Sequence, residues 1–266
     1  MKYGFILTGE PSEVIELAQE AEAAGWDGVF LPDGWTTAWI ILTAIAMRTQ
    51  HIALGTMLTP LPEQFPWYVA AQTAILDQIS GGRVILATGL GVLELDKFGM
   101  LDNKVRAQRL DEALELVNGW WQGESLRSFT YEGRYYHLQE MAANVDWHTH
   151  APLQKPRIPI WVIGGPKQSQ LRRAARWDGA IIQENNPDVF RERKAAIEAL
   201  RPNHSPLDII TEGETPPNDP ARAATIVRPY AEAGATWWLE SMWELEGVTR
   251  NYDMHTRIRS GPPRIS

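Results

Sequence analysis

Small residues follow two apolar runs at positions where the backbone could approach a ligand closely. The run Val84-Ile85-Leu86-Ala87-Thr88 has the character of a buried strand, and Gly89-Leu90-Gly91 comes directly after it. The sequence Gly164-Gly165-Pro166 stands between another apolar run and a predicted helix. Glycines at the start of a helix leave N–H groups open to an anion, so phosphate is the natural ligand there. A tight turn without a ligand is the alternative.

Residues at other strand ends could line a slot for a flat ring with polar edges. Thr56 ends one predicted strand and Thr88-Gly89 ends the next, and each combines small size with a hydroxyl group. The candidate binding residues for such a ring are Leu7, Thr56, Met57, Leu58, Thr88 and Gly89. Ordinary loop residues are the alternative interpretation of the same pattern.

Acidic residues end several predicted strands as well. Glu184, Glu212 and Glu240 follow successive strands, and two such carboxylates could act together as they do in glycosidases. Spacing along the chain cannot establish that pair. Asp33 and Trp35 follow an earlier strand, so Asp33, Trp35 and Glu184 are candidates for catalysis, and no catalytic residue is assigned.

Other kinds of chemistry lack their residues. The sequence has no Cys, which excludes thiol catalysis and thiolate-bound metals, and it has no Gly-x-Ser-x-Gly motif for a hydrolase. His148 and His150 have no nearby partner cluster, so a solvated loop is favoured and no metal site is predicted.

The elements that must position these residues alternate regularly. Predicted strands cover 3–7, 28–31, 51–58, 83–88, 158–163, 179–183, 207–211 and 236–240. Predicted helices follow at about 11–25, 36–48, 66–79, 103–121, 167–176, 188–200, 219–233 and 244–258. Eight such units predict one α/β domain over residues 1–266, a (β/α)8 TIM barrel whose site lies at the carboxyl ends of its strands.

Two features qualify this architecture. Residues 123–152 break the alternation and form an insertion, in which FTYEGRYYHL indicates a hairpin that turns at Glu132-Gly133. An open doubly wound sheet is the alternative to a barrel. The Gly-x-Gly-x-x-Gly fingerprint is missing after the first strand, which disfavours that alternative.

The overall charge limits the partners. The 266 residues carry a formal net charge of -8, which argues against nucleic acid or an anionic membrane surface as a partner. The start of the chain does not resemble a signal peptide, and no apolar run approaches the length of a membrane span. We therefore expect a cytoplasmic protein.

Several stretches together resemble the luciferase-like class of flavin-dependent oxidoreductases. The similar stretches are AQEAEAAGWDGVFLPD, HIALGTMLTPLPEQFPWYVAAQTAILDQISGGRVILATGLG, RLDEALELVNGWWQGESLRSFTYEGRYYHL and IPIWVIGGPKQSQLRRAARWDGAI. They cover most of the chain to about residue 185. Their combination is specific, whereas each stretch alone is not.

The resemblance implies a TIM barrel that binds FMN or the related deazaflavin coenzyme F-420 (F420) across its mouth. The ring would lie by Thr88-Gly89, and the phosphate would bind at Gly164-Gly165-Pro166, with Lys97 as a weaker candidate partner. Members often have a cis peptide bond that does not involve proline, here expected near Met57-Leu58. The implied partners are a small organic substrate, a flavin reductase and a second copy of the chain.

The sequence also departs from that family's pattern. Gly34 follows Asp33 where many relatives have His, and Val92 stands where sugar-phosphate dehydrogenases of the class have Glu. That dehydrogenase activity is therefore not expected. We expect a monooxygenase that uses reduced FMN and O₂. Part of an apolar lid could come from Trp35, Trp39, Phe65 and Trp67, with core or rim packing as the alternative for each. A deazaflavin-dependent hydride-transfer enzyme and a non-catalytic flavin-binding protein are the alternatives.

Overall fold

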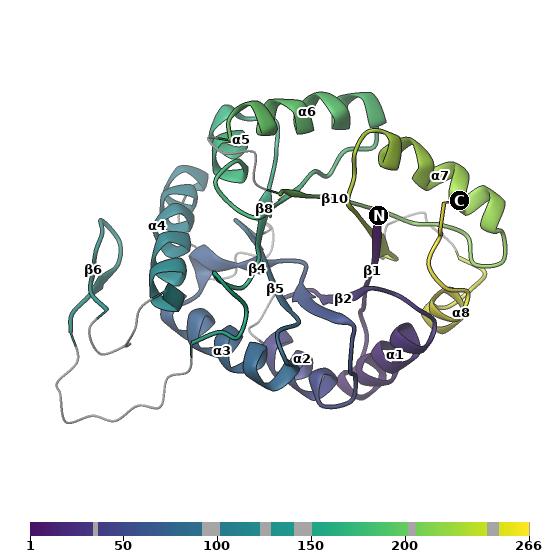
Figure 1. The fold of residues 1–266 in the computed structure, drawn as a ribbon, viewed down its shortest axis with the longest axis horizontal. Helices are drawn as coiled ribbons and strands as arrows, with labels where there is room; N and C mark the ends of the chain where they lie inside the picture. The colour runs from purple at the N-terminus through teal and green to yellow at the C-terminus, as the bar shows by residue number, and fades with distance from the viewer. Residues whose placement is uncertain are drawn as a thin grey trace.

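The chain folds into a closed barrel of parallel strands surrounded by helices (Figure 1). The computed structural model describes residues 1–33, 37–91, 102–122, 129–140, 151–201, 206–243 and 250–265. Eight strands form the ring in the order β3-β2-β1-β11-β10-β9-β8-β5, and β5 pairs with β3 to close it. The predicted TIM barrel is confirmed.

The barrel strands agree with the predicted ones to within a few residues. They are β1 (Lys2–Ile6), β2 (Gly28–Leu31), β3 (Ala53–Thr56), β5 (Val84–Gly89), β8 (Ile160–Ile163), β9 (Gly179–Ile181), β10 (Asp208–Gly213) and β11 (Trp237–Ser241). A short strand that was not predicted, β4 (Thr59–Pro60), adds to the mouth by pairing Thr59 with Thr88 of β5. The predicted hairpin is confirmed as β6 (Tyr131–Glu132) and β7 (His137–Leu138).

Helices cover the outside of the barrel. They are α1 (Pro11–Ala23), α2 (Ala38–Ala46), α3 (Pro66–Ser80), α4 (Asn103–Gln122), α5 (Gln168–Ala174), α6 (Pro187–Ala199), α7 (Pro220–Glu232) and α8 (Met254–Arg259), with a short 3-10 turn η1 (Leu61–Glu63). Proline stands in the first turn of α1, α3, α6 and α7, where its missing N–H costs nothing. Gly81 ends α3 in the left-handed conformation, at φ 73°.

The last helix is shorter than the sequence indicated. The prediction began it at residue 244; residues 244–249 lie outside the described part, and 250–253 are not helical. The side chain of Asp253 accepts a hydrogen bond from the N–H of Thr256 at 2.8 Å and so begins α8 at Met254. Arg250 and Tyr252 instead reach Glu214 at 2.6–2.8 Å, which fixes the segment outside a helix. The predicted start was wrong for 250–253.

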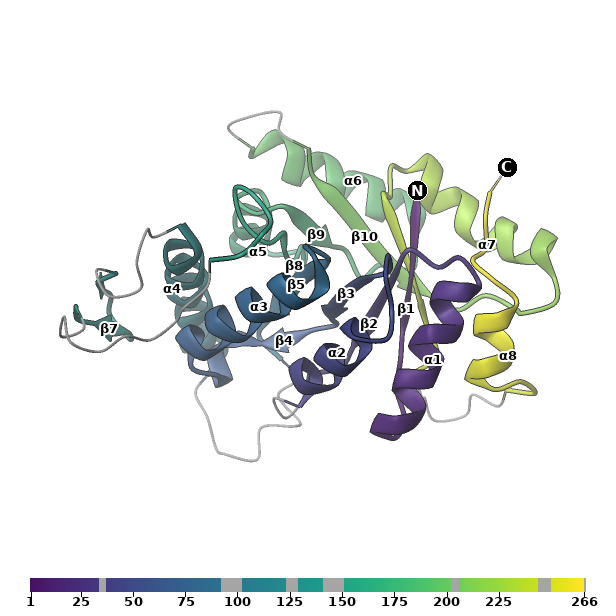
Figure 2. The same ribbon diagram turned by 60° about the horizontal axis from the view of Figure 1, so that its bottom comes forward.

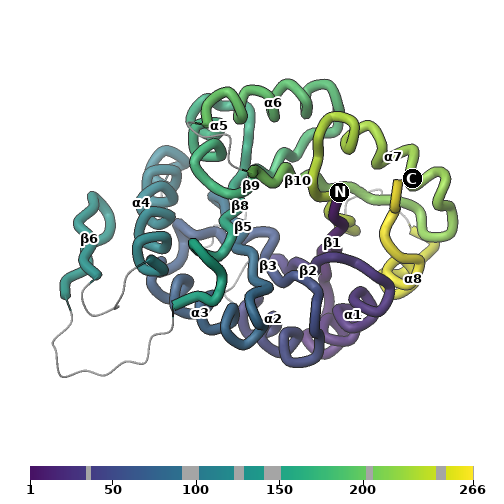
Figure 3. Tube along the Cα trace, in the orientation of Figure 1, coloured from purple at the N-terminus to yellow at the C-terminus, as the bar shows by residue number. Residues whose placement is uncertain are grey.

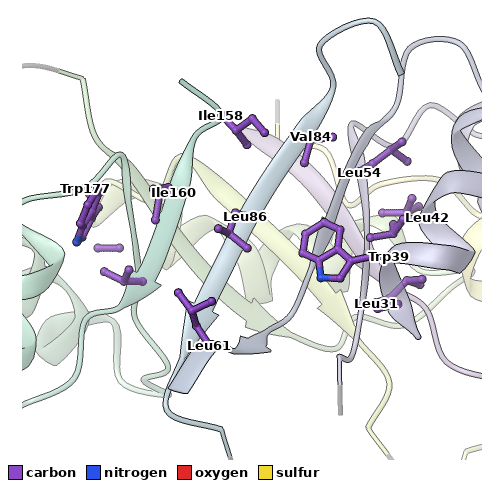
Figure 4. Packing of buried hydrophobic residues seen from close by; sticks show 14 of the residues in the cluster. Leu31, Trp39, Leu42, Leu54, Leu61, Val84, Leu86, Ile158, Ile160 and Trp177 are labelled. Atoms are coloured by element: carbon purple, nitrogen blue, oxygen red, sulfur yellow. The ribbon is translucent and has the colours of Figure 1, made fainter. Parts of the chain in front are cut away.

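Apolar side chains form two separate layers because successive strand residues point to opposite faces. One layer fills the barrel interior and includes Phe30, Trp161 and Trp237, whose ring centroids lie 5.2–5.9 Å apart. The other layer lies between strands and helices, and Figure 4 shows part of it around Leu86 and Trp39. This alternation is regular enough to tell which residue of a strand faces the interior.

The end of the barrel where strands begin is held by carboxylates that bond to backbone. Asp27 accepts the N–H of Tyr3 at 2.8 Å, and Asp178 accepts the N–H of Ile160 at 3.0 Å and pairs with Arg157. Both aspartates belong to a Trp-Asp-Gly sequence that joins a helix to a strand. These residues therefore stabilise the fold at the end away from the predicted site.

The hairpin and the chain ends lie outside the barrel. The hairpin projects beyond α4 (Figure 3), where Glu112 of that helix accepts the N–H groups of Arg134 and Tyr135 at 3.0 and 2.8 Å. The two chain ends lie on the same side (Figure 2), and the N–H of Ile265 bonds to the hydroxyl of Tyr3. Among the described residues, no helix is long and apolar enough to cross a membrane.

Candidate functional site at the barrel mouth

The mouth of the barrel has an apolar half, which we call the ring seat: Met57, Leu58, Gly89 and Ile163. Met57 belongs to the interior cluster, and Leu58 and Ile163 pack against it while keeping some exposure. A side chain on Gly89 would come within 3.0–3.1 Å of Leu58 and Ile163. Because glycine has no side chain, nothing projects between these two residues. The seat is therefore a smooth apolar platform made by β3, β5 and β8, which suits one face of a planar ring.

The peptide bond between Met57 and Leu58 is cis. The resemblance placed such a bond near these two residues, and that expectation is confirmed. The bond lies directly after β3, so both side chains follow the strand into the mouth.

The hydroxyl groups of the two predicted threonines take part in a buried network behind the seat. Thr56 shares a hydrogen bond with Thr59 at 2.9 Å, and Thr88 donates to the carbonyl of Thr59 at 2.8 Å. Thr59 in turn donates to Asp33 at 2.7 Å, and Gln64 donates to the same carboxylate oxygen at 3.2 Å. Thr56 and Thr88 are fully buried, so the structure places them as supports of the mouth, and Asp33 lies beside them.

Leu7 and the Gly164 loop also pack within the protein. Leu7 belongs to the layer between strands and helices. The N–H of Gly164 bonds to the carbonyl of Ile181 at 2.8 Å, and a side chain on Gly164 would meet Ile197 of α6. A side chain on Gly165 would overlap Gln170, which accepts the N–H of Lys167 and caps α5. Pro166 is exposed. A phosphate at Gly164-Gly165-Pro166 stays a prediction.

The other half of the mouth carries what we call the polar edge: Gln183, Glu212 and Trp243. The amide of Gln183 donates to Glu212 at 2.6 Å, and the indole N–H of Trp243 donates to the other carboxylate oxygen at 2.9 Å. Ile181 and Ile210 lie in the interior cluster, so Gln183 and Glu212, two residues further on, face the same way. Trp243 packs against that cluster. The carboxylate thus lies at the mouth with both oxygens held.

The other strand-end glutamates point elsewhere. Glu184 pairs with Arg193 of α6 at 3.1 Å. Glu240 is fully buried behind the barrel, where Arg257, Thr215 and Trp238 all donate to its carboxylate. The structure therefore does not bring Glu184, Glu212 and Glu240 together, which leaves a glycosidase pair without geometric support.

A buried arginine lies beside the loop after β5. Arg106 of α4 is 1 % exposed and bonds to Glu63 and to the carbonyl of Leu90. Its Nε and Nη1 have no hydrogen-bond partner within the described residues. A side chain on Gly91 would come within 3.1 Å of this guanidinium, so the glycine keeps the space beside it open. Arg106 is thus a fixed cation with unused donors at the rim.

Some candidates fall outside the described residues, namely Trp35 and Lys97. The two histidines at 148 and 150 do as well. Within the described part, no group of three or more His, Cys, Asp or Glu residues is arranged to hold a metal ion.

A family model described as "Luciferase-like monooxygenase" matches residues 4–238 of this chain. The chain belongs to the luciferase-like monooxygenase family. The match includes every strand that forms the seat. The predicted family membership is confirmed.

Relatives within and around the family carry different cofactors in their names. An F420-dependent glucose-6-phosphate dehydrogenase of Microbacterium testaceum is 30% identical over 211 residues, 73% of this chain and 60% of that protein. The chain thus matches somewhat more than half of the length of this curated relative. The coenzyme F420-dependent tetrahydromethanopterin reductase of Methanopyrus kandleri has a TM-score of 0.75 at 17% identity, over 97% of this chain and 96% of that one.

An oxygenase has the same fold. The oxygenating constituent of 3,6-diketocamphane monooxygenase of Pseudomonas putida, in complex with FMN, has a TM-score of 0.68 at 17% identity, over 87% of this chain and 72% of that one. At such identities the two structures are similar to this luciferase-like chain in fold alone.

The sequence interpretation placed Ile163 and Gln183 at strand ends without choosing them as site residues, and it missed Trp243 and Arg106. The alternation along β8 and β9 could have indicated that Ile163 and Gln183 face inward, once the strand register was known. Nothing in the sequence marks Trp243 as a partner of Glu212, because the two are 31 residues apart. Arg106 stands among other charged residues of a helix and has no local signal either.

Proposed function

We propose that this luciferase-like protein is an F420-dependent oxidoreductase that transfers hydride between the deazaflavin and a small organic substrate. The observation that carries the proposal is the ring seat, a smooth apolar platform around the cis Met57-Leu58 bond. It is supported by the 30% identical relative, whose name states dependence on F420. The reading we expected first from the sequence, oxygenation with reduced FMN, becomes the second candidate, and the FMN-bound oxygenase of the same fold is what favours it.

The residues present fit a cofactor of this kind. Gly89 leaves room that a side chain would fill, so Leu58 and Ile163 can contact a ring face. Arg106 offers a buried positive charge and unused N–H donors to the phosphate-bearing chain of the cofactor. When bound, F420 supplies the carbon that accepts or gives hydride. The protein supplies the apolar seat that orients the ring and excludes water from one face.

The first test is equilibrium binding of F420 and of FMN to the purified protein. We expect saturable binding of F420 and weaker binding of FMN. Tighter binding of FMN, followed by O₂-dependent turnover, would replace this proposal with the oxygenase.

A variant of the seat tests where the ring binds. Ile163→Trp should fill the platform and weaken F420 binding by about tenfold or more, which corresponds to about 1.4 kcal/mol. The matched control is Ile79→Trp on the exposed face of α3, which should bind F420 like the wild type. Equal affinities of the two variants would contradict the seat, provided that both show the wild-type unfolding temperature.

A further inference from the structure

We propose that Glu212 is the catalytic base of this protein and that it binds a hydroxyl group of the substrate at the mouth. The inference rests on the proposed function, because it needs hydride transfer to a cofactor in the seat. It adds the residue that handles the proton and the chemical class of the substrate.

The position of Glu212 fits that role. It faces the mouth, and Trp243, which donates to it, packs on the same interior cluster as Leu58 and Ile163 of the ring seat. The polar edge and the ring seat are thus two sides of one opening. Glu212 keeps partial exposure, so a ligand can reach it.

The bonding of Glu212 fixes the orientation of its carboxylate and leaves acceptor capacity for a substrate. Gln183 and Trp243 donate to different carboxylate oxygens, so both oxygens serve as acceptors, as they do in the ionised form. Each oxygen has a further lone pair open to a substrate hydroxyl. The two donors are uncharged, so no cation competes with the substrate for the negative charge, in contrast to Glu184 with Arg193 and Glu240 with Arg257.

Glu212 would also supply a proton acceptor that this sequence lacks at two other positions. Gly34 and Val92 occupy the places where the resemblance led us to expect the acid/base His and the Glu of related dehydrogenases. Hydride transfer from an alcohol still requires a group that takes the hydroxyl proton. A carboxylate on β10 would provide that group from another side of the mouth.

An alcohol substrate would lose a hydride from carbon and a proton from oxygen. The C–H bond of the carbinol carbon breaks and its electron pair leaves with the hydrogen as hydride to the deazaflavin. The O–H proton passes to Glu212, and the carbon–oxygen double bond forms. The alcohol is oxidised to a carbonyl compound, the deazaflavin is reduced, and Glu212 returns the proton to water or, in the reverse reaction, to the new alkoxide.

The charge at the mouth selects the substrate class. Neither the ring seat nor the polar edge contains a basic residue, Arg106 at the rim is paired with Glu63, and Glu212 contributes a negative charge. A substrate with a phosphate or carboxylate near its hydroxyl would be repelled by Glu212. The geometry therefore points to uncharged or cationic hydroxyl compounds, in contrast to the sugar phosphate named for the relative from Microbacterium testaceum.

The experiment uses the full chain loaded with F420 and compares the wild type with Glu212→Gln. Glu198→Gln, the same chemical change in a surface pair with Lys194 on α6, is the matched control. Hydride transfer from 2-propanol and cyclohexanol is followed by the loss of deazaflavin absorbance. Binding of cyclohexylammonium and of cyclohexanecarboxylate is measured by calorimetry, which does not depend on turnover.

We expect Glu212→Gln to bind F420 like the wild type and to lose at least about 100-fold in hydride-transfer rate, the usual contribution of a general base. The wild type should prefer the ammonium probe to the carboxylate probe, and the variant should lose that preference. Glu198→Gln should behave like the wild type in every assay.

The results separate a failure of the proposed function from a failure of the role inferred for Glu212. A wild-type protein that does not bind F420 overturns the proposed function, and this inference with it. If F420 binds, three results overturn the inference alone: a rate in Glu212→Gln equal to that of the wild type, a wild-type preference for the carboxylate probe, or no binding and no turnover of any of the four probes.

Discussion

A glutamate at the mouth of the barrel and a glutamate in the layer behind it have opposite environments. Glu212 of β10 and Glu240 of β11 lie on paired strands, one step apart in register, because Gly213 pairs with Glu240. Glu212 points into the mouth and bonds to two uncharged side chains, whereas Glu240 points outward and is enclosed with Arg257. The difference teaches that a shift of one residue along a strand decides between a group that can meet substrate and one that holds the fold together.

The energetic consequences of the two environments differ as well. Burial raises the pKa of Glu240 above its ordinary value, although Arg257 acts in the opposite direction. Breaking a buried pair of this kind is costly because the remaining charge has no compensation. Glu212 is partly exposed to water, so changing it should cost little stability. The comparison between the two glutamates can therefore be tested by unfolding.

The largest effect should follow from Arg257→Met. It leaves the carboxylate of Glu240 buried without its cation, and we expect the free energy of unfolding to fall by about 3–5 kcal/mol. Urea denaturation monitored by circular dichroism measures the change. A loss below about 1 kcal/mol, as is typical of surface ion pairs, would break the contrast between the two layers.

The same variant should show a sharper dependence on pH. A carboxyl group with a raised pKa in the folded state contributes stability below its unfolded pKa, and this contribution falls as the pH rises toward the folded pKa. Removing Arg257 raises the pKa of Glu240 further, so the loss of stability in Arg257→Met should be larger at high pH than near the ordinary pKa of glutamate. Denaturation at a series of pH values tests the sign, and a constant loss would contradict it.

An intermediate effect is expected at the opposite end of the barrel. Asp178→Ala removes the acceptor of the Ile160 N–H and the partner of Arg157, and we expect a loss of about 1–3 kcal/mol. The loss of stability should be accompanied by wild-type cofactor affinity, because Asp178 lies away from the mouth. A specific loss of F420 binding without a loss of stability would show that this end of the barrel is coupled to the site.

The smallest change in stability should come from Glu212→Gln. The amide keeps one oxygen acceptor, and the free energy of unfolding should change by no more than about 1 kcal/mol. This near-neutral stability, together with the large loss of rate proposed above, is what separates the mouth from the layer behind it. A loss as large as that of Arg257→Met would mean that Glu212 is a structural residue, like Glu240.

The sequence by itself determined the barrel, because its eight strand-and-helix units leave few ways to bury their apolar faces. It also located the cis bond at Met57-Leu58 through family resemblance. It could not show which way the side chains at strand ends face. We predicted Thr56, Thr88 and Glu240 to lie at the mouth, but they are buried behind it. That depends on strand register, which a single-residue shift reverses.

Contacts between distant segments were likewise decided only by the tertiary structure. Glu212 meets Gln183 and Trp243 because β10 pairs with both β9 and β11, which brings the ends of the three strands to one rim. Arg257 of α8 reaches Glu240 of β11 across 17 residues of chain, a contact that only the packing of α8 on the barrel provides. Local pattern determines which elements form, whereas the contacts between charges and donors at the mouth exist only once the strands are paired in their final order and register.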